Sequence, residues 1–121
     1  MDEEINKIAI ALQTETDPIR LVDWLTKLAG YAATYEGLLQ PIQMEKPIRW
    51  LLIQKQKDGA GENREKPLSD KKTEMTWATT EEGQKELLYT SKMKQISLMS
   101  QAIRQNLYAK KIEFRNLNPN Y

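Results

Sequence analysis

The fold class is decided by the stretch TTEEGQKELLYTSKMKQISLMSQAIRQNLYAKKIEFR, residues 79–115. Its large apolar side chains recur at steps of mostly three and four, which places them on one face of an α-helix. They are Tyr89, Met93, Ile96, Ile103, Leu107 and Phe114, with gaps in the series at Ser100 and Lys110. Thr79 can cap the first turn and Glu82 can reach back to it. The spacing predicts a long amphipathic helix whose apolar face must pack against another helix.

A second apolar series begins after Thr16-Asp17-Pro18, where Asp17 suits the N-cap position and proline suits the first helical position. The series keeps a four–three spacing for three heptads, through Leu21, Leu25, Leu28, Ala32, Tyr35, Leu39 and Ile42. This is the pattern of a coiled-coil seam. It serves equally well as the core of a hairpin within one chain or as an interface between copies, so both interpretations stay open.

Proline and acidic residues mark the limits of the N-terminal helices. Residues 2–14 form a predicted short leading helix, with acidic residues in its first turn that suit the helix dipole. Pro41 and Pro47 each remove a backbone donor and clash with the preceding turn. They therefore predict a kink or break near Gln40 in the second helix.

The remaining segments are connections and ends. Residues 58–68 contain two glycines and a proline, which predicts a mobile loop. Ser69 or Asp70 can cap a short helix that leads into the long C-terminal one. Residues 116–121 are expected to fray.

These patterns predict an all-α protein, with residues 1–121 forming a single helical domain. The expected architecture is a long, kinked, antiparallel helical hairpin with a short N-terminal helix, which self-associates through its apolar seams. The residues predicted to form the hairpin or oligomer seam are Leu21, Leu25, Leu28, Tyr35, Leu39, Met93, Ile96, Ile103 and Leu107.

Composition excludes several kinds of chemistry. The chain of 121 residues has no cysteine and no histidine, which removes thiol chemistry and the commonest proton-transfer side chain and metal ligand. It carries no phosphate-loop, dinucleotide-binding or serine-hydrolase motif. No apolar run reaches the roughly 20 residues of a membrane span, and the N-terminus is acidic where a signal peptide is basic. We expect a cytoplasmic protein that is not an enzyme and uses no metal or cofactor.

Charge is distributed unevenly although the net charge is +1. Residues 1–45 hold eight acidic and three basic side chains, for a net charge of −5, whereas residues 46–72 hold eight basic and four acidic ones, for +4. Such a basic segment can neutralise phosphates and release their counterions. The residues predicted to bind nucleic acid are Arg49, Lys55, Lys57, Arg64, Lys66, Lys71 and Lys72. A solvated helix end is the alternative interpretation.

Two tryptophans flank this basic segment. Trp50 and Trp77 could stack on unpaired bases, or they could belong to the core, which we favour for Trp77.

The order of segments resembles a known family. The helix end LLIQKQK at residues 51–57, a glycine-containing loop, LSDK at residues 68–71 and a long helix with AIR and KKIEF are similar to the small helical recombination mediators of tailed phages. The resemblance covers roughly residues 44–116. It implies a homo-oligomer that binds single-stranded DNA and helps load a RecA-type recombinase onto strands coated with single-strand-binding protein. It places DNA contacts on Lys55 and Lys57.

The sequence therefore favours a non-enzymatic, single-stranded nucleic-acid-binding recombination mediator or accessory protein. Its expected partners are single-stranded DNA, a RecA-type recombinase or single-strand-binding protein, and further copies of itself. The alternative is a phage-encoded helical protein–protein adaptor or inhibitor without nucleic-acid affinity. A structural role in a coat or packaging assembly is a third possibility.

Overall fold

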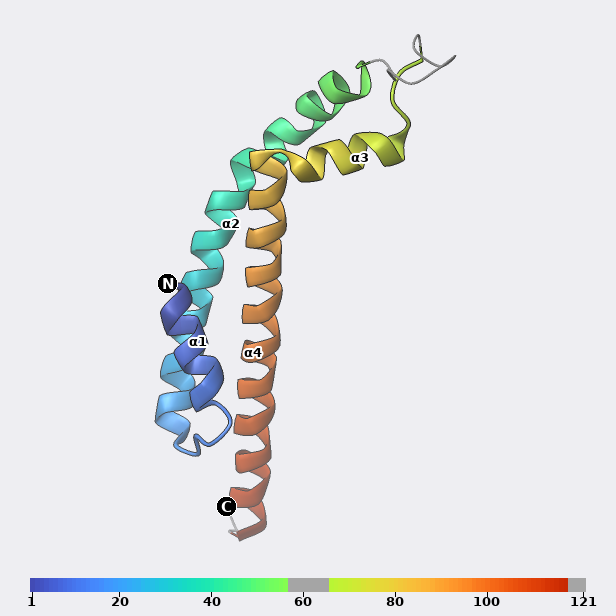
Figure 1. The fold of residues 1–121 in the computed structure, drawn as a ribbon. Helices are drawn as coiled ribbons and strands as arrows, with labels where there is room; N and C mark the ends of the chain where they lie inside the picture. The colour runs from blue at the N-terminus through green and yellow to red at the C-terminus, as the bar shows by residue number, and fades with distance from the viewer. Residues whose placement is uncertain (57–65, 118–121) are drawn as a thin grey trace. The chain divides into compact units, whose positions relative to one another are not determined.

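The computed structural model describes residues 1–56 and 66–117. Within these ranges the chain forms four α-helices and no strand, so the predicted all-α class is confirmed. The helices are α1 (Asp2–Ala11), α2 (Pro18–Gln54), α3 (Asp70–Thr79) and α4 (Glu81–Leu117) (Figure 1). Among the described residues, no helix is both long enough and apolar enough to cross a membrane.

The chain divides into two compact units. Met1–Thr34 and Lys92–Tyr121 form one, here called the terminal unit, and Tyr35–Ser91 forms the other, the central unit. Helices α2 and α4 each contribute to both units. Each unit has its own buried residues and is described by itself.

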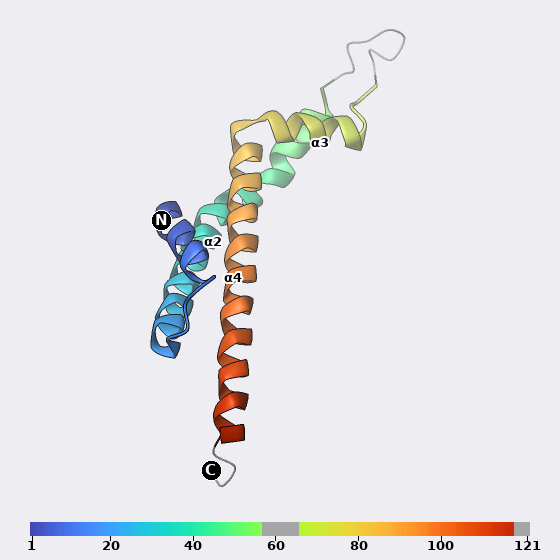
Figure 2. The same cartoon turned by 60° about the horizontal axis from the view of Figure 1, so that its bottom comes forward.

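The terminal unit is built from α1, the first part of α2 and the larger part of α4. In both views α1 lies alongside the beginning of α2 (Figures 1 and 2). Its buried apolar side chains come from all three helices and are Ile5, Ile8, Leu21, Leu28, Ile96, Met99 and Ile103. Among the predicted seam residues of this unit, Leu25, Met93 and Leu107 are half-buried. The side chain of Phe114, another predicted member of the apolar face, lies outside the described part.

The central unit packs α3 and the start of α4 against the second part of α2. Ile42, Ile53 and Trp77 form its buried cluster, with Trp50, Leu68 and Tyr89 packed against them. The predicted seam residues Tyr35 and Leu39 are also buried in this unit. The rings of Tyr35 and Tyr89 lie with their centroids 5.8 Å apart, which adds an aromatic contact between α2 and α4.

Two predicted helix starts are confirmed by their side-chain caps. The Ile19 backbone N–H donates to Asp17 Oδ1 at 3.0 Å, and α2 begins at Pro18. The Lys72 backbone N–H donates to Ser69 Oγ at 3.3 Å, which makes Ser69 the N-cap of α3. Both caps satisfy backbone donors that the first helical turn leaves unpaired.

The predicted start of the C-terminal helix is wrong by one residue. The Gly83 N–H donates to Thr80 Oγ1 at 3.0 Å, so the N-cap is Thr80. The Thr79 hydroxyl instead donates to the Thr76 carbonyl at 2.7 Å and belongs to the end of α3. Position N3 is therefore a glycine, which has no side chain to complete a reciprocal capping box.

Helix α2 continues through both of its prolines. Pro41 and Pro47 lie inside the 37-residue helix, so of the two outcomes predicted near Gln40, a kink or a break, the break does not occur. Each proline removes one intrahelical hydrogen bond and costs about 3 kcal/mol in a helix interior. The buried side chains of Leu39 and Ile42, on either side of Pro41, hold the helix to the central unit and offset that cost.

Candidate nucleic-acid interface

The end of α2 and the beginning of α3 are joined by direct hydrogen bonds. The Leu68 backbone N–H lies 3.1 Å from the Gln54 carbonyl and 3.2 Å from the Gln56 carbonyl. The Gln54 side-chain amide donates to Asp70 Oδ1 at 2.7 Å. Leu68 also packs against the buried cluster of the central unit. These contacts hold residues 54–56 and 66–72 together in one place, here called the α2–α3 junction.

Four of the predicted nucleic-acid contacts lie at this junction. All four are exposed, and we call them the junction lysines: Lys55, Lys66, Lys71 and Lys72. Within the described residues, Lys55, Lys66 and Lys71 form no ion pair with a carboxylate. Asp70 is the only acid in the described junction, where Lys55, Lys66 and Lys71 outnumber it.

The position of Lys71 and Lys72 strengthens the positive potential. Both lie in the first turn of α3, whose N-terminus already carries the positive end of the helix dipole. Cations there reduce helix stability slightly, whereas a phosphate group placed there is stabilised by the dipole and by free backbone N–H groups. The arrangement is therefore better suited to receiving an anion than to stabilising the helix.

Arg49 is not part of this cluster. Its Nη1 lies 2.8 Å from Glu82 Oε2, and its Nε lies 3.6 Å from Glu45 Oε2. The pair with Glu82 joins α2 to the first turn of α4 and neutralises the guanidinium. Lys57 and Arg64, two further predicted contacts, lie outside the described residues.

The tryptophans near the basic segment face protein groups. Trp77 is 3% exposed, and its indole N–H donates to Glu86 Oε1 at 3.2 Å. Lys46 Nζ lies 2.9 Å from the same oxygen and 5.6 Å from the centroid of the Trp77 ring. Trp50 is half-buried against the central cluster. Trp77 is therefore a core residue, as we favoured, and is unavailable for stacking on a base.

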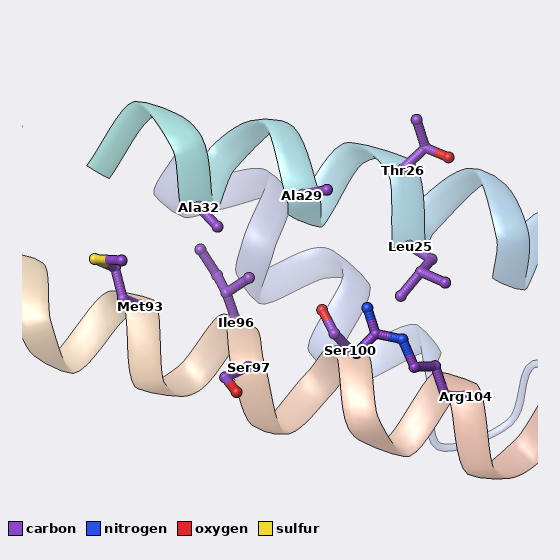
Figure 3. A pocket seen from close by; sticks show the side chains of 9 residues that line it. All are labelled: Leu25, Thr26, Ala29, Ala32, Met93, Ile96, Ser97, Ser100 and Arg104. Atoms are coloured by element: carbon purple, nitrogen blue, oxygen red, sulfur yellow. The ribbon is translucent and has the colours of Figure 1, made fainter. Parts of the chain in front are cut away.

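A groove in the terminal unit is a second feature with a defined lining. It has a volume of about 540 Å³ and lies between α2 and α4 (Figure 3). Ala29 and Ala32 of α2, with Ser97 and Ser100 of α4, leave the space because their side chains are short. The remaining lining residues are Leu25, Thr26, Met93, Ile96 and Arg104.

The groove offers little chemistry of its own. Arg104 is its single charged group, and no carboxylate lines it to act as a proton acceptor. Ser100, which interrupts the apolar face of α4, is buried here. Nor do the described residues contain a group of three or more Asp, Glu, His or Cys side chains that could hold a metal ion.

Sequence reasoning missed the interaction between Lys46 and Glu86. The two residues are 40 positions apart, and each has several possible partners in the sequence. The only local signal is that Lys46 falls four residues after Ile42, on the face of α2 that carries the buried residues. No protein-family model, curated protein sequence or solved structure matches this chain.

Proposed function

We propose that this protein is a non-enzymatic binder of single-stranded nucleic acid that contacts the phosphate backbone through the junction lysines. The observation that carries the proposal is the joining of the α2 end to the α3 start through Gln54, Leu68 and Asp70. These contacts support the proposal because they hold the segments that carry the exposed residues Lys55, Lys66, Lys71 and Lys72 next to each other. A recombination-accessory role, with a RecA-type recombinase or single-strand-binding protein as partner, is what the family resemblance adds to this proposal.

Binding of this kind is electrostatic and independent of base sequence. Each neutralised phosphate releases condensed counterions, so affinity falls as salt concentration rises. For four lysine–phosphate contacts on a single strand, the slope of log K against log salt is about −3. The burial of Trp77 removes one source of base stacking, and the proposed contacts are therefore mainly to phosphate.

In this proposal the protein acts as a homo-oligomer, and α2 and α4 of each copy form an antiparallel hairpin. Assembly would multiply weak contacts, because linked sites engage one strand with a raised effective concentration. The seam residues Leu21, Leu28, Ile96 and Ile103 are already buried within the single chain. Association between copies therefore requires a different surface.

The direct test is a fluorescence-anisotropy titration of a labelled oligothymidylate at low and moderate salt. The test variant replaces Lys55, Lys66, Lys71 and Lys72 with glutamine. The matched control replaces four exposed lysines of the terminal unit, which changes the net charge by the same amount: Lys7, Lys27, Lys94 and Lys111.

The proposal expects salt-sensitive binding that the junction variant loses and the control variant retains. A duplex of the same length, titrated in parallel, measures the preference for single strands. No binding at low salt, or an equal loss in both variants, would reject the junction as the site.

A second candidate function is a helical protein–protein adaptor. The observation that favours it is the amount of apolar surface left uncovered: among the described residues, 15 large hydrophobic side chains are exposed and 12 hydrophobic side chains are buried. Large exposed apolar patches mark surfaces that bind other proteins. An adaptor would show a stoichiometric complex on pull-down and no salt-dependent affinity for the oligonucleotide.

A further inference from the structure

One stretch of α2 in the central unit is apolar on two opposite sides. Ile42 and Ile53 face the buried cluster, and Trp50 packs against it. On the other side of the helix, four large side chains are between 56% and 71% exposed, and we call them the outer strip: Met44, Ile48, Leu51 and Leu52. A helix that is apolar all round is normally buried all round. The outer strip therefore lacks a partner within the described chain.

Two charged residues of this stretch, Lys46 and Arg49, lie away from the strip, whereas the exposed Glu45 lies at its edge, three residues before Ile48. Lys46 pairs with Glu86, and Arg49 pairs with Glu82 and Glu45. Beyond Glu45, the next ionisable side chain on the outer side is Lys55, one turn beyond Leu51. The four strip residues are themselves uncharged and run about 12 Å along the helix, at 1.5 Å per residue.

The occupant is indicated by the internal symmetry of the strip. Met44 lies four residues before Ile48, and Leu52 lies four residues after it. A two-fold axis at Ile48 would place Met44 of one copy against Leu52 of the other, and Ile48 against itself. An isologous interface requires this kind of self-complementarity.

Charge selects the direction of the pairing. In a parallel pair, Lys55 of one copy would lie beside Lys55 of the other, and like charges in contact oppose association. In an antiparallel pair centred on Ile48, Lys55 lies beside Pro41, which is exposed and uncharged. The antiparallel arrangement is the one that avoids this repulsion.

The rest of this chain offers no better occupant. Residues 57–65 and 118–121 contain a single large apolar side chain, Tyr121, and no aliphatic side chain larger than alanine. We propose that the outer strip is the interface of an antiparallel homodimer, with Ile48 on its two-fold axis. The four residues of the interface are distinct from the junction lysines, of which Lys55 lies at the end of the strip.

The strip is smaller than the roughly 800 Å² per partner of a standard stable interface, so the dimer should dissociate on dilution. Sedimentation velocity of the full chain over a concentration series is the first measurement. We expect a shift from monomer to dimer as concentration rises. Ile48→Glu and Ile48→Lys should each raise the dissociation constant about 100-fold, because each places two like charges face to face.

Mixing the two variants tests the geometry itself. An equimolar mixture of Ile48→Glu and Ile48→Lys should regain dimer, since the axis would then join opposite charges. Leu98→Glu is the matched control, because Leu98 is 59% exposed on α4 in the terminal unit. It should dimerise like the parent chain. A parent chain that is monomeric throughout, variants that dimerise normally, or a mixture that stays monomeric would each overturn the proposal.

A chemical test needs no charge substitution. The chain contains no cysteine, so Ile48→Cys introduces a unique thiol. A disulfide requires Cα atoms about 4.4–6.8 Å apart, a spacing that residues on a two-fold axis can reach. Mild oxidation should convert Ile48→Cys to a covalent dimer and leave Leu98→Cys monomeric. Failure of Ile48→Cys to link, or equal linking of the two variants, would contradict the proposed axis.

Discussion

Lys46 Nζ lies 2.9 Å from Glu86 Oε1, and this ion pair joins α2 to α4 within the central unit across 40 residues of sequence. The same carboxylate oxygen accepts a hydrogen bond from the Trp77 indole N–H at 3.2 Å, which brings α3 into the contact. The ammonium group also lies 5.9 Å and 5.6 Å from the ring centroids of Trp50 and Trp77. One carboxylate therefore connects three helices at the edge of the buried cluster.

Removing this carboxylate should destabilise the central unit. Glu86→Ala leaves the Lys46 ammonium and the Trp77 N–H without their acceptor, and hydrogen bonds to charged groups contribute about 2 kcal/mol each at partly buried sites. We expect a loss of about 2–4 kcal/mol in the free energy of unfolding, measured by urea denaturation with tryptophan fluorescence. Glu74→Ala, at an exposed position of α3, should change stability by less than about 0.5 kcal/mol. Equal effects of the two substitutions would show that the connection is energetically unimportant.

Position 83 has no room for a side chain, so a glycine is required there. A Cβ atom at this position would lie 1.9 Å from the Trp77 carbonyl oxygen and 2.7 Å from its carbon, and both are backbone atoms that cannot easily move away. Gly83→Ala should therefore cost about 2–3 kcal/mol through overpacking. Thermal unfolding followed by circular dichroism measures the change.

Gly37 provides a control of opposite sign. It lies inside α2, and a Cβ atom there would meet nothing within 4 Å. Gly37→Ala should stabilise the protein by up to about 1 kcal/mol, because alanine has the higher helix propensity. If both glycine substitutions stabilise the protein, the close approach of α3 to α4 at Gly83 is incorrect.

The cap of α4 can be located by a pair of alanine substitutions. Thr80 Oγ1 accepts the Gly83 N–H at 3.0 Å and donates to the Trp77 carbonyl at 2.6 Å. Thr80→Ala should cost about 1–2 kcal/mol, the usual effect of removing an N-cap. Thr79→Ala removes only a bond to its own helix and should cost less. If urea denaturation shows a larger loss of stability for Thr79→Ala than for Thr80→Ala, Thr79 is the cap.

Dimerisation and nucleic-acid binding should be separable. Ile48→Asn removes an apolar group from the proposed interface without changing charge, so binding of a short oligonucleotide that reaches one junction should be unaffected. A longer strand that reaches both junctions of a dimer should bind about 100-fold more weakly, because the second contact is no longer intramolecular. Anisotropy titrations with both lengths test this. A loss of short-strand affinity would mean that Ile48 contacts nucleic acid directly.

Several features could be predicted because they depend on nearby residues. The three-and-four spacing of apolar side chains located the helices that became α2 and α4, and Asp17 and Ser69 were recognisable as caps from their immediate neighbours. The same reasoning misplaced the cap of α4, since Thr79 and Thr80 are adjacent and locally equivalent. It also allowed for a break near Gln40 that does not occur, because packing of the flanking turns outweighs the local preference of Pro41.

The candidate site was only partly predictable. The basic segment was visible in the sequence, but its division into neutralised and exposed basic residues was not. Arg49 lies 2.8 Å from Glu82, whereas Lys55 and Lys71 remain exposed and without an ion pair in the described ranges. The pairs of Lys46 with Glu86 and of Arg49 with Glu82 join residues more than 30 positions apart. No local pattern specifies such a contact.

By itself, the sequence determined that the protein is helical, where most of its helices begin, and that histidine and cysteine chemistry is absent. Those properties follow from composition and from interactions within one or two helical turns. Only the tertiary structure decided which charges are neutralised and which apolar faces stay uncovered. The Lys46–Glu86 pair and the exposed side of α2 at Ile48 result from the way separate helices meet, and that packing is a property of the folded chain as a whole.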